Sequence, residues 1–68
     1  LHITKFKSYI MIQKVKILKN YSTFELENEV NNFIEKFNPN AIVDVEYSAI
    51  LDFNNCIMYS CLISYLVK

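Results

Sequence analysis

Few side chains in this sequence have a type and spacing that could support catalysis. Its only histidine is His2, and a catalytic imidazole needs a rigid position and an orienting partner. Asp44 and Glu46 are two residues apart, so on a strand their carboxylates would share one face, as an acid–base pair requires. Nothing in the pattern forces apolar groups around them, so raised pKa values are not implied. We expect a solvated or partner-binding strand face here, no catalytic residue, and a protein that is not an enzyme.

The two cysteines do not suggest a disulfide or a metal site. Cys56 and Cys61 lie in one apolar run, and on a strand they would point to opposite faces. Their separation would be about 16 Å, which is too far for a disulfide. Together with His2 they do not have the spacing of zinc ligands, so we expect no metal and no cofactor. Unpaired thiols favour a reducing compartment, the cytoplasm.

The tyrosines raise the alternative of a nucleotide ligand. Tyr9 and Tyr21 could stack on a base, with lysines nearby for phosphate. Tyr47, Tyr59 and Tyr65 instead fall on rows that we assign to the core. A pocket for a small nucleotide signal, formed between subunits, therefore stays open as an alternative.

Composition excludes several classes of protein. The chain has 68 residues, 53% of them hydrophobic, with no glycine and a formal net charge of zero. Without glycine it has no phosphate-binding P-loop and no dinucleotide fingerprint. Residues 11–68 carry five lysines and seven acidic residues, a balance that argues against duplex nucleic acid as a partner. The longest apolar run is interrupted by serines and is too short to cross a membrane as a helix, so we expect no membrane partner.

One amphipathic helix is predicted at residues 23–37. Ser22 and Glu25 have the spacing of a capping box, in which the serine accepts an amide proton and the glutamate reaches back. Apolar residues then recur at helical spacing: Leu26, Val30, Phe33, Ile34 and Phe37. Pro39 ends the helix, because the residue before a proline is pushed out of the helical region.

Three strands are predicted around this helix, at residues 13–19, 41–50 and 56–67. The first two alternate polar and apolar side chains, whereas the third is largely apolar on both faces and is therefore expected in the centre. Turn residues at 52–55 indicate a hairpin between the second and third strands. The predicted fold is α+β: a single β-α-β-β domain whose three-stranded sheet has the order 1-3-2, with the helix on one face.

The sheet face without the helix is the predicted interface. We assign Val15 and Ile17 to the helix side and the neighbouring row of the first strand to the open side. A second copy stacked there would cover an apolar stripe and set lysines against acids. The residues expected at this interface are Lys14, Lys16, Leu18, Asp44, Glu46, Met58 and Leu62.

Residues 1–10 lack a clear period. We expect them to be a disordered arm or upstream translated sequence, with Met11 as the native start and 11–68 as the single domain.

Residues 11–68 resemble a small sporulation-associated family of spore-forming Gram-positive bacteria and their phages. The resemblance rests on Lys-Val-Lys-Ile at 14–17, the helix at 22–37, Ile-Val-Asp-Val-Glu-Tyr at 42–47 and Met-Tyr-Ser-Cys-Leu-Ile at 58–63. Family members usually carry a basic residue where Glu46 stands, and the family has no established catalytic residues. The resemblance implies a small non-enzymatic protein of sporulation or of a phage. The preferred hypothesis is a homo-oligomeric cytoplasmic interaction module with an unknown protein partner.

Overall fold

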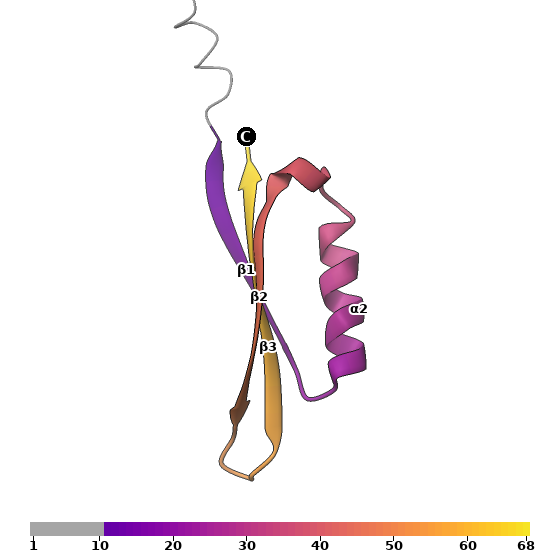
Figure 1. The fold of residues 1–68 in the computed structure, drawn as a ribbon, viewed down its shortest axis with the longest axis vertical. Coiled ribbons are helices and arrows are strands. Elements are labelled where there is room, and N and C mark those ends of the chain that lie inside the picture. The colour runs from indigo at the N-terminus through magenta and orange to yellow at the C-terminus, as the bar shows by residue number, and fades with distance from the viewer. Residues whose placement is uncertain (1–10) are drawn as a thin grey trace, which may run out of the picture.

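The computed structural model describes residues 11–68, so the predictions for residues 1–10 lie outside the described part. Along the chain it contains strand β1 (Ile12–Asn20), helix α2 (Thr23–Ile34), a short 3₁₀ helix η1 (Pro39–Ala41), strand β2 (Ile42–Leu51) and strand β3 (Ile57–Val67). Helix α2 lies along one face of the sheet (Figure 1).

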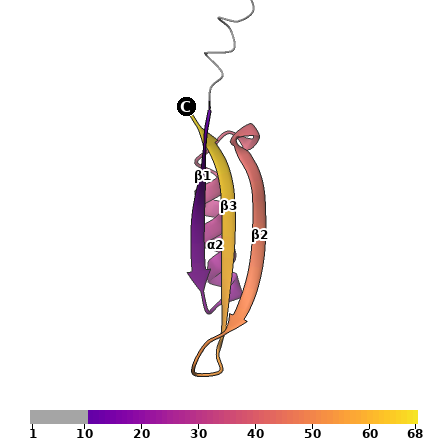
Figure 2. The ribbon, with the colours of Figure 1, turned by 90° about the vertical axis from the view of Figure 1, so that its left-hand side faces the viewer.

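The sheet has the order β1-β3-β2, and both outer strands run antiparallel to β3. Figure 2 shows β3 between its two neighbours. Strands β1 and β2 therefore run in the same direction, and α2 carries the chain from the end of one to the start of the other. This confirms the predicted α+β fold with strand order 1-3-2.

Helix α2 begins where the sequence predicts, although its cap differs in one bond. The Ser22 hydroxyl accepts the amide of Glu25 at 3.2 Å. The Ser22 amide donates to Asn20 Oδ1 at 2.9 Å, so Asn20 makes the second capping bond that was expected from Glu25. The helix ends at Ile34, three residues earlier than predicted. The next turn tightens, with Phe37 donating to the Ile34 carbonyl at 3.0 Å.

The buried core is small and lies between α2 and β3. Leu26 and Val30 of α2 meet Cys61 and Ile63 of β3, and all four are at most 2% exposed. One end of this core is closed by an aromatic cluster of Phe33, Phe37 and Tyr65, whose ring centroids lie 4.9–5.2 Å apart. Because β3 contributes core residues and has neighbours on both edges, its apolar character suits its central position.

Strand β1 faces the opposite way from the prediction. Leu18 lies opposite Cys61 and Lys16 opposite Ile63, and residues directly opposite in an antiparallel pair share a face. Lys14, Lys16 and Leu18 are therefore on the helix side. Leu18 packs against the core, and the Lys16 stem lies along the sheet edge with its Nζ 5.9 Å from the Phe33 ring centroid. Long lysine stems tolerate such a position, so their charges did not force them onto the open side.

The start of β2 also departs from simple alternation. The register shifts between Ile42 and Asp44, which leaves Val43 as an extra residue at an irregularity of the strand. Ile42 consequently lies opposite Tyr65 and packs against the core. Regular alternation with Asp44 and Glu46 would place Ile42 on the open side, and the register shift reverses this.

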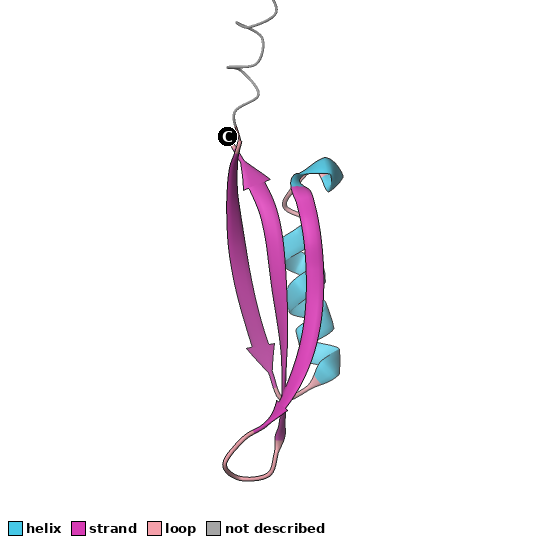
Figure 3. Ribbon diagram, turned by 60° about the vertical axis from the view of Figure 1, so that its left-hand side comes forward, coloured by secondary structure: helices cyan, strands magenta, loops and turns pink. Residues whose placement is uncertain are grey.

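The predicted hairpin between β2 and β3 is present, and Asp52 organises its turn. Its Oδ1 accepts the amides of Asn54 at 2.8 Å and Cys56 at 2.9 Å. Asn55 adopts φ 62°, a left-handed conformation that asparagine tolerates. The hairpin projects past the first turn of α2 (Figure 3). The apolar side chains near its end, at Leu51 and Phe53, are therefore exposed.

Candidate functional site

The sheet face opposite α2, called the open face below, presents an apolar stripe to solvent. From β1 it carries Val15 and Ile17, which are 56% and 57% exposed. The register places Leu62 of β3 directly beside Ile17, and Leu66 extends the same row. Glu46 and Asp44 of β2 lie on the other side of Leu62 and Ser64. The open face is thus mainly apolar over β1 and β3, whereas β2 contributes Asp44 and Glu46 and, farther along, the exposed Ile50 opposite Met58.

Only part of the predicted interface lies on this face. Asp44, Glu46, Met58 and Leu62 occur there together, whereas the three predicted residues of β1 lie on the helix side. The exposed apolar residues that the prediction missed are Val15, Ile17 and Ile50. Both rows of β1 contain an apolar residue, so alternation alone could not decide which row faces the helix.

A shallow hollow marks the centre of the open face. It has a volume of about 260 Å³, and Ile17, Glu46 and Leu62 line it along one row of the sheet. A protruding apolar side chain from another molecule would fit this hollow better than it would fit a flat sheet surface.

The carboxylates of the open face influence each other. The pKa of Glu46 is raised from its usual value, first by a hydrogen bond with Asp44 and then by that residue's negative charge. The sequence pattern did not imply this rise, because it places no apolar groups around the pair. The main cause is the neighbouring carboxylate. The pair remains exposed, with no buried surface to hold a substrate against it.

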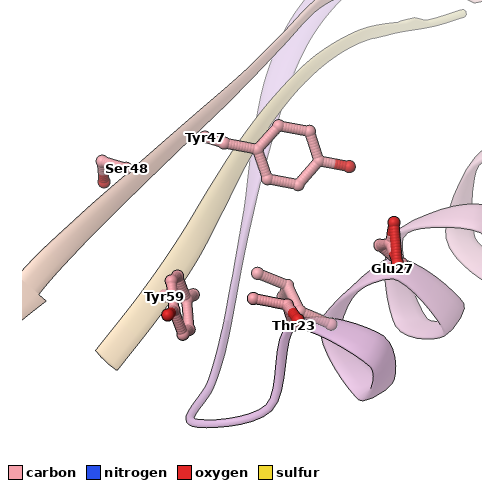
Figure 4. Close-up of a pocket in the computed structure, with 6 residues that line it drawn as sticks. Thr23, Glu27, Tyr47, Ser48 and Tyr59 are labelled. Carbon is pink, nitrogen blue, oxygen red and sulfur yellow. The ribbon is translucent and has the colours of Figure 1, made fainter. Parts of the chain in front are cut away.

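A second candidate site lies on the other face, beside the first turns of α2. It is a pocket of about 350 Å³ lined by Thr23, Leu26, Glu27, Tyr47, Ser48 and Tyr59 (Figure 4). Helix α2 packs mainly over β1 and β3, so the edge strand β2 stays uncovered on this side. The pocket is the space between that edge and the helix.

Tyr47 forms one wall of this pocket. Its ring extends from β2 toward the helix, with the hydroxyl on the side of Glu27 (Figure 4). Partial burial is the first cause that raises the Tyr47 pKa, followed by the neighbouring Cys61. Burial likewise raises the pKa of the Cys61 thiol, which keeps this cysteine protonated and unreactive.

Tyr21 is held by the hairpin turn. Its hydroxyl donates to Asp52 Oδ2 at 2.7 Å, across 31 residues of sequence. This bond raises the Tyr21 pKa and, together with the turn amides, lowers the Asp52 pKa. Tyr21 is one of the tyrosines expected to be able to stack on a base. In the structure its hydroxyl instead joins the start of α2 to the hairpin.

Residues 11–68 offer neither a metal site nor a helix that could span a membrane. This range brings together no group of three His, Cys, Asp or Glu side chains that could hold a metal ion. None of its helices has the length and apolarity needed to cross a membrane. His2 and Tyr9 lie outside the described residues.

Comparisons with known proteins identify the chain by its family alone. Searches of curated proteins and of solved structures gave no match. The family model described as sporulation protein Cse60 matches residues 11–66, which include β1, α2, β2 and nearly all of β3. The chain belongs to the sporulation protein Cse60 family.

Proposed function

We propose that this member of a sporulation protein family is a non-catalytic module that associates with itself through the open face of its sheet. The observation that carries the proposal is the apolar stripe on that face, in which the exposed Val15 and Ile17 lie beside the half-buried Leu62. A contiguous apolar patch on a sheet face typically marks an interaction site. A domain of this size also gains stability by covering such a face, since its own core is small.

The distribution of apolar side chains favours one way of stacking two copies. A two-fold axis parallel to the strands would set Val15 and Ile17 of one copy against Asp44 and Glu46 of the other. An axis across the strands sets each strand on its own counterpart, so the apolar stripes meet. The acidic edges then face each other at the solvated rim, where salt screens their repulsion. This second arrangement replaces the lysine-to-acid pairing expected from sequence, because Lys14 and Lys16 lie on the helix side.

The available area suggests a reversible association. Three strands of this length form a face of roughly 30 by 14 Å, about 400 Å² in projection for each copy. Such a face falls at the small end of specific interfaces, so its dissociation should be measurable at micromolar concentrations. Several protein concentrations are therefore needed to detect it.

Features of the described residues support a cytoplasmic, non-enzymatic role. Cys56 is a free thiol on the surface and Cys61 a free thiol in the core, which suits a reducing compartment. The carboxylate pair of Asp44 and Glu46 is exposed, whereas general acid–base catalysis usually relies on a shielded group. The family supports a sporulation setting, and a phage setting remains part of the proposal.

Size-exclusion chromatography with light scattering on the full chain tests the proposal. It should be run from about 10 to 500 µM, a range suited to a small interface, with absorbance recorded at 260 and 280 nm. A mass that rises from one copy to two with concentration is the expected result. A single-copy mass throughout would refute self-association. Excess absorbance at 260 nm with the dimer would point instead to the alternative of a nucleotide held between subunits.

A further inference from the structure

The pocket beside α2 has walls of distinct chemical character. Tyr47 and Tyr59 contribute two aromatic rings, from the edge strand and the central strand, and Leu26 adds an aliphatic side chain. Glu27 supplies a carboxylate from the helix, on the side toward which the Tyr47 hydroxyl points (Figure 4). The Ser48 hydroxyl is used elsewhere, since it lies 2.7 Å from Ser60 Oγ on the open face.

The charge around this pocket selects against anions. Its lining contains one carboxylate and no lysine. Among the side-chain hydrogen bonds within residues 11–68, none engages Glu27. The positive charges of Lys14 and Lys16 sit on β1, the other edge of the sheet. A phosphate or carboxylate would therefore meet a negative charge here with no cation to offset it.

The size and the walls favour a ligand with one ring. About 350 Å³ is near the lower limit of small-molecule pockets, which suits a single-ring compound. Tyrosine rings attract a cation placed over their faces, and a nearby carboxylate strengthens that preference. We infer that this pocket binds a small ligand that combines one aromatic ring with a protonated amine.

This pocket and the hollow on the open face share Tyr47 and Ser48 in their linings, but they lie on opposite faces of the sheet. The pocket opens on the helix side, and the apolar stripe of Val15 and Ile17 lies on the opposite face. A second copy on the open face would leave the pocket accessible. Self-association and amine binding can therefore succeed or fail independently.

Three probes of similar size test the inference on the full ¹⁵N-labelled chain by NMR titration. They are benzylammonium, benzyl alcohol and benzoate, which differ in charge. Each is added to about 10 mM, because single-ring ligands reach only modest affinity. Benzylammonium should shift the amides of Thr23, Glu27 and Tyr47 in a saturable way, benzyl alcohol more weakly, and benzoate not at all. Equal binding of the three probes, no saturable shift, or shifts confined to other residues would overturn the inference.

Matched variants distinguish a direct effect of the Glu27 carboxylate on binding from an effect of the overall negative charge of helix α2. Glu27→Gln should weaken benzylammonium binding about 3-fold or more and leave benzyl alcohol unchanged. Glu25→Gln removes the same charge from the same helix outside the pocket lining, and it should leave both affinities unchanged. Equal effects of the two variants would show that long-range charge alone attracts the amine, against a site at Glu27. Tyr47→Ala should abolish saturable binding, and retained binding would contradict the role of this ring.

Discussion

Replacing Ile17 with lysine should dissociate the dimer proposed for the open face. Ile17 is 57% exposed in the single chain and lies opposite Leu62 at the centre of the apolar stripe. Its side chain does not belong to the core cluster around Leu26 and Ile63, so the fold should survive the substitution. The change therefore acts on association and only weakly on folding.

The size of the effect follows from the area that Ile17 leaves exposed. Full burial of an isoleucine side chain stabilises by about 1.5–3 kcal/mol, so burial of its exposed share would contribute about 0.9–1.7 kcal/mol. A two-fold interface uses each residue twice, which brings the contribution of Ile17 to about 1.8–3.4 kcal/mol for the dimer. Its loss corresponds to a dissociation constant roughly 20- to 300-fold higher. Burial of a lysine charge in the same place adds to this weakening.

Sedimentation equilibrium or light scattering across concentrations measures this constant for the wild type and the variant. Phe24→Lys is the matched control, because Phe24 is 71% exposed but lies on α2, away from the open face. This control should leave the constant unchanged, and far-UV circular dichroism should show that both variants fold. The reasoning is refuted if Ile17→Lys leaves the constant unchanged, or if Phe24→Lys raises it equally.

Three further outcomes concern stability and titration. Leu26→Ala should lower the free energy of unfolding by about 2–5 kcal/mol in urea titrations, since Leu26 is only 2% exposed. A loss below about 1 kcal/mol would contradict the assignment of Leu26 to the core. Because the Asp52 pKa is lowered on folding, the ionised carboxylate stabilises the fold. This contribution to stability is present above pH 3.8 and is lost as the pH falls through the folded pKa. In NMR titrations, Tyr21→Phe should move that pKa back toward 3.8, and an unchanged value would rule out the hydroxyl as its main cause. The Glu46 pKa is raised on folding, so the pH dependence of its contribution to stability is reversed. That contribution favours folding below pH 4.5 and is lost as the pH rises through the folded value. Asp44→Asn should lower the Glu46 pKa toward 4.5 if the neighbouring carboxylate raises it.

Much of the fold could be predicted because it depends on strong local patterns. The helix follows from its apolar spacing and from Ser22 as its cap, and the central position of β3 from its two apolar faces. The orientation of β1 could not be predicted, because Ile17 and Leu18 give each row an apolar residue. Only the register with β3, which sets Leu18 opposite Cys61, decides between the rows.

The candidate sites were less accessible to sequence reasoning. The acidic part of the open face was predicted from the alternation around Asp44 and Glu46. The pocket was not, because it depends on how far α2 sits from β2, and helical periodicity carries no information on that offset. The raised pKa of Glu46 was not predicted, because apolar surroundings were considered as a cause and the neighbouring carboxylate of Asp44 was not.

The order of the strands also has a consequence for the synthesis of this protein. Every pairing in the sheet involves β3, which is the last strand of the described chain to be made. Until Ile57–Val67 leaves the ribosome, β1 and β2 have no partner, and Leu26 and Val30 have no Cys61 or Ile63 to pack against. The sheet can therefore form only after Ile57–Val67 has been synthesised, and a chain that stops before β3 would expose its apolar segments to chaperones and proteases.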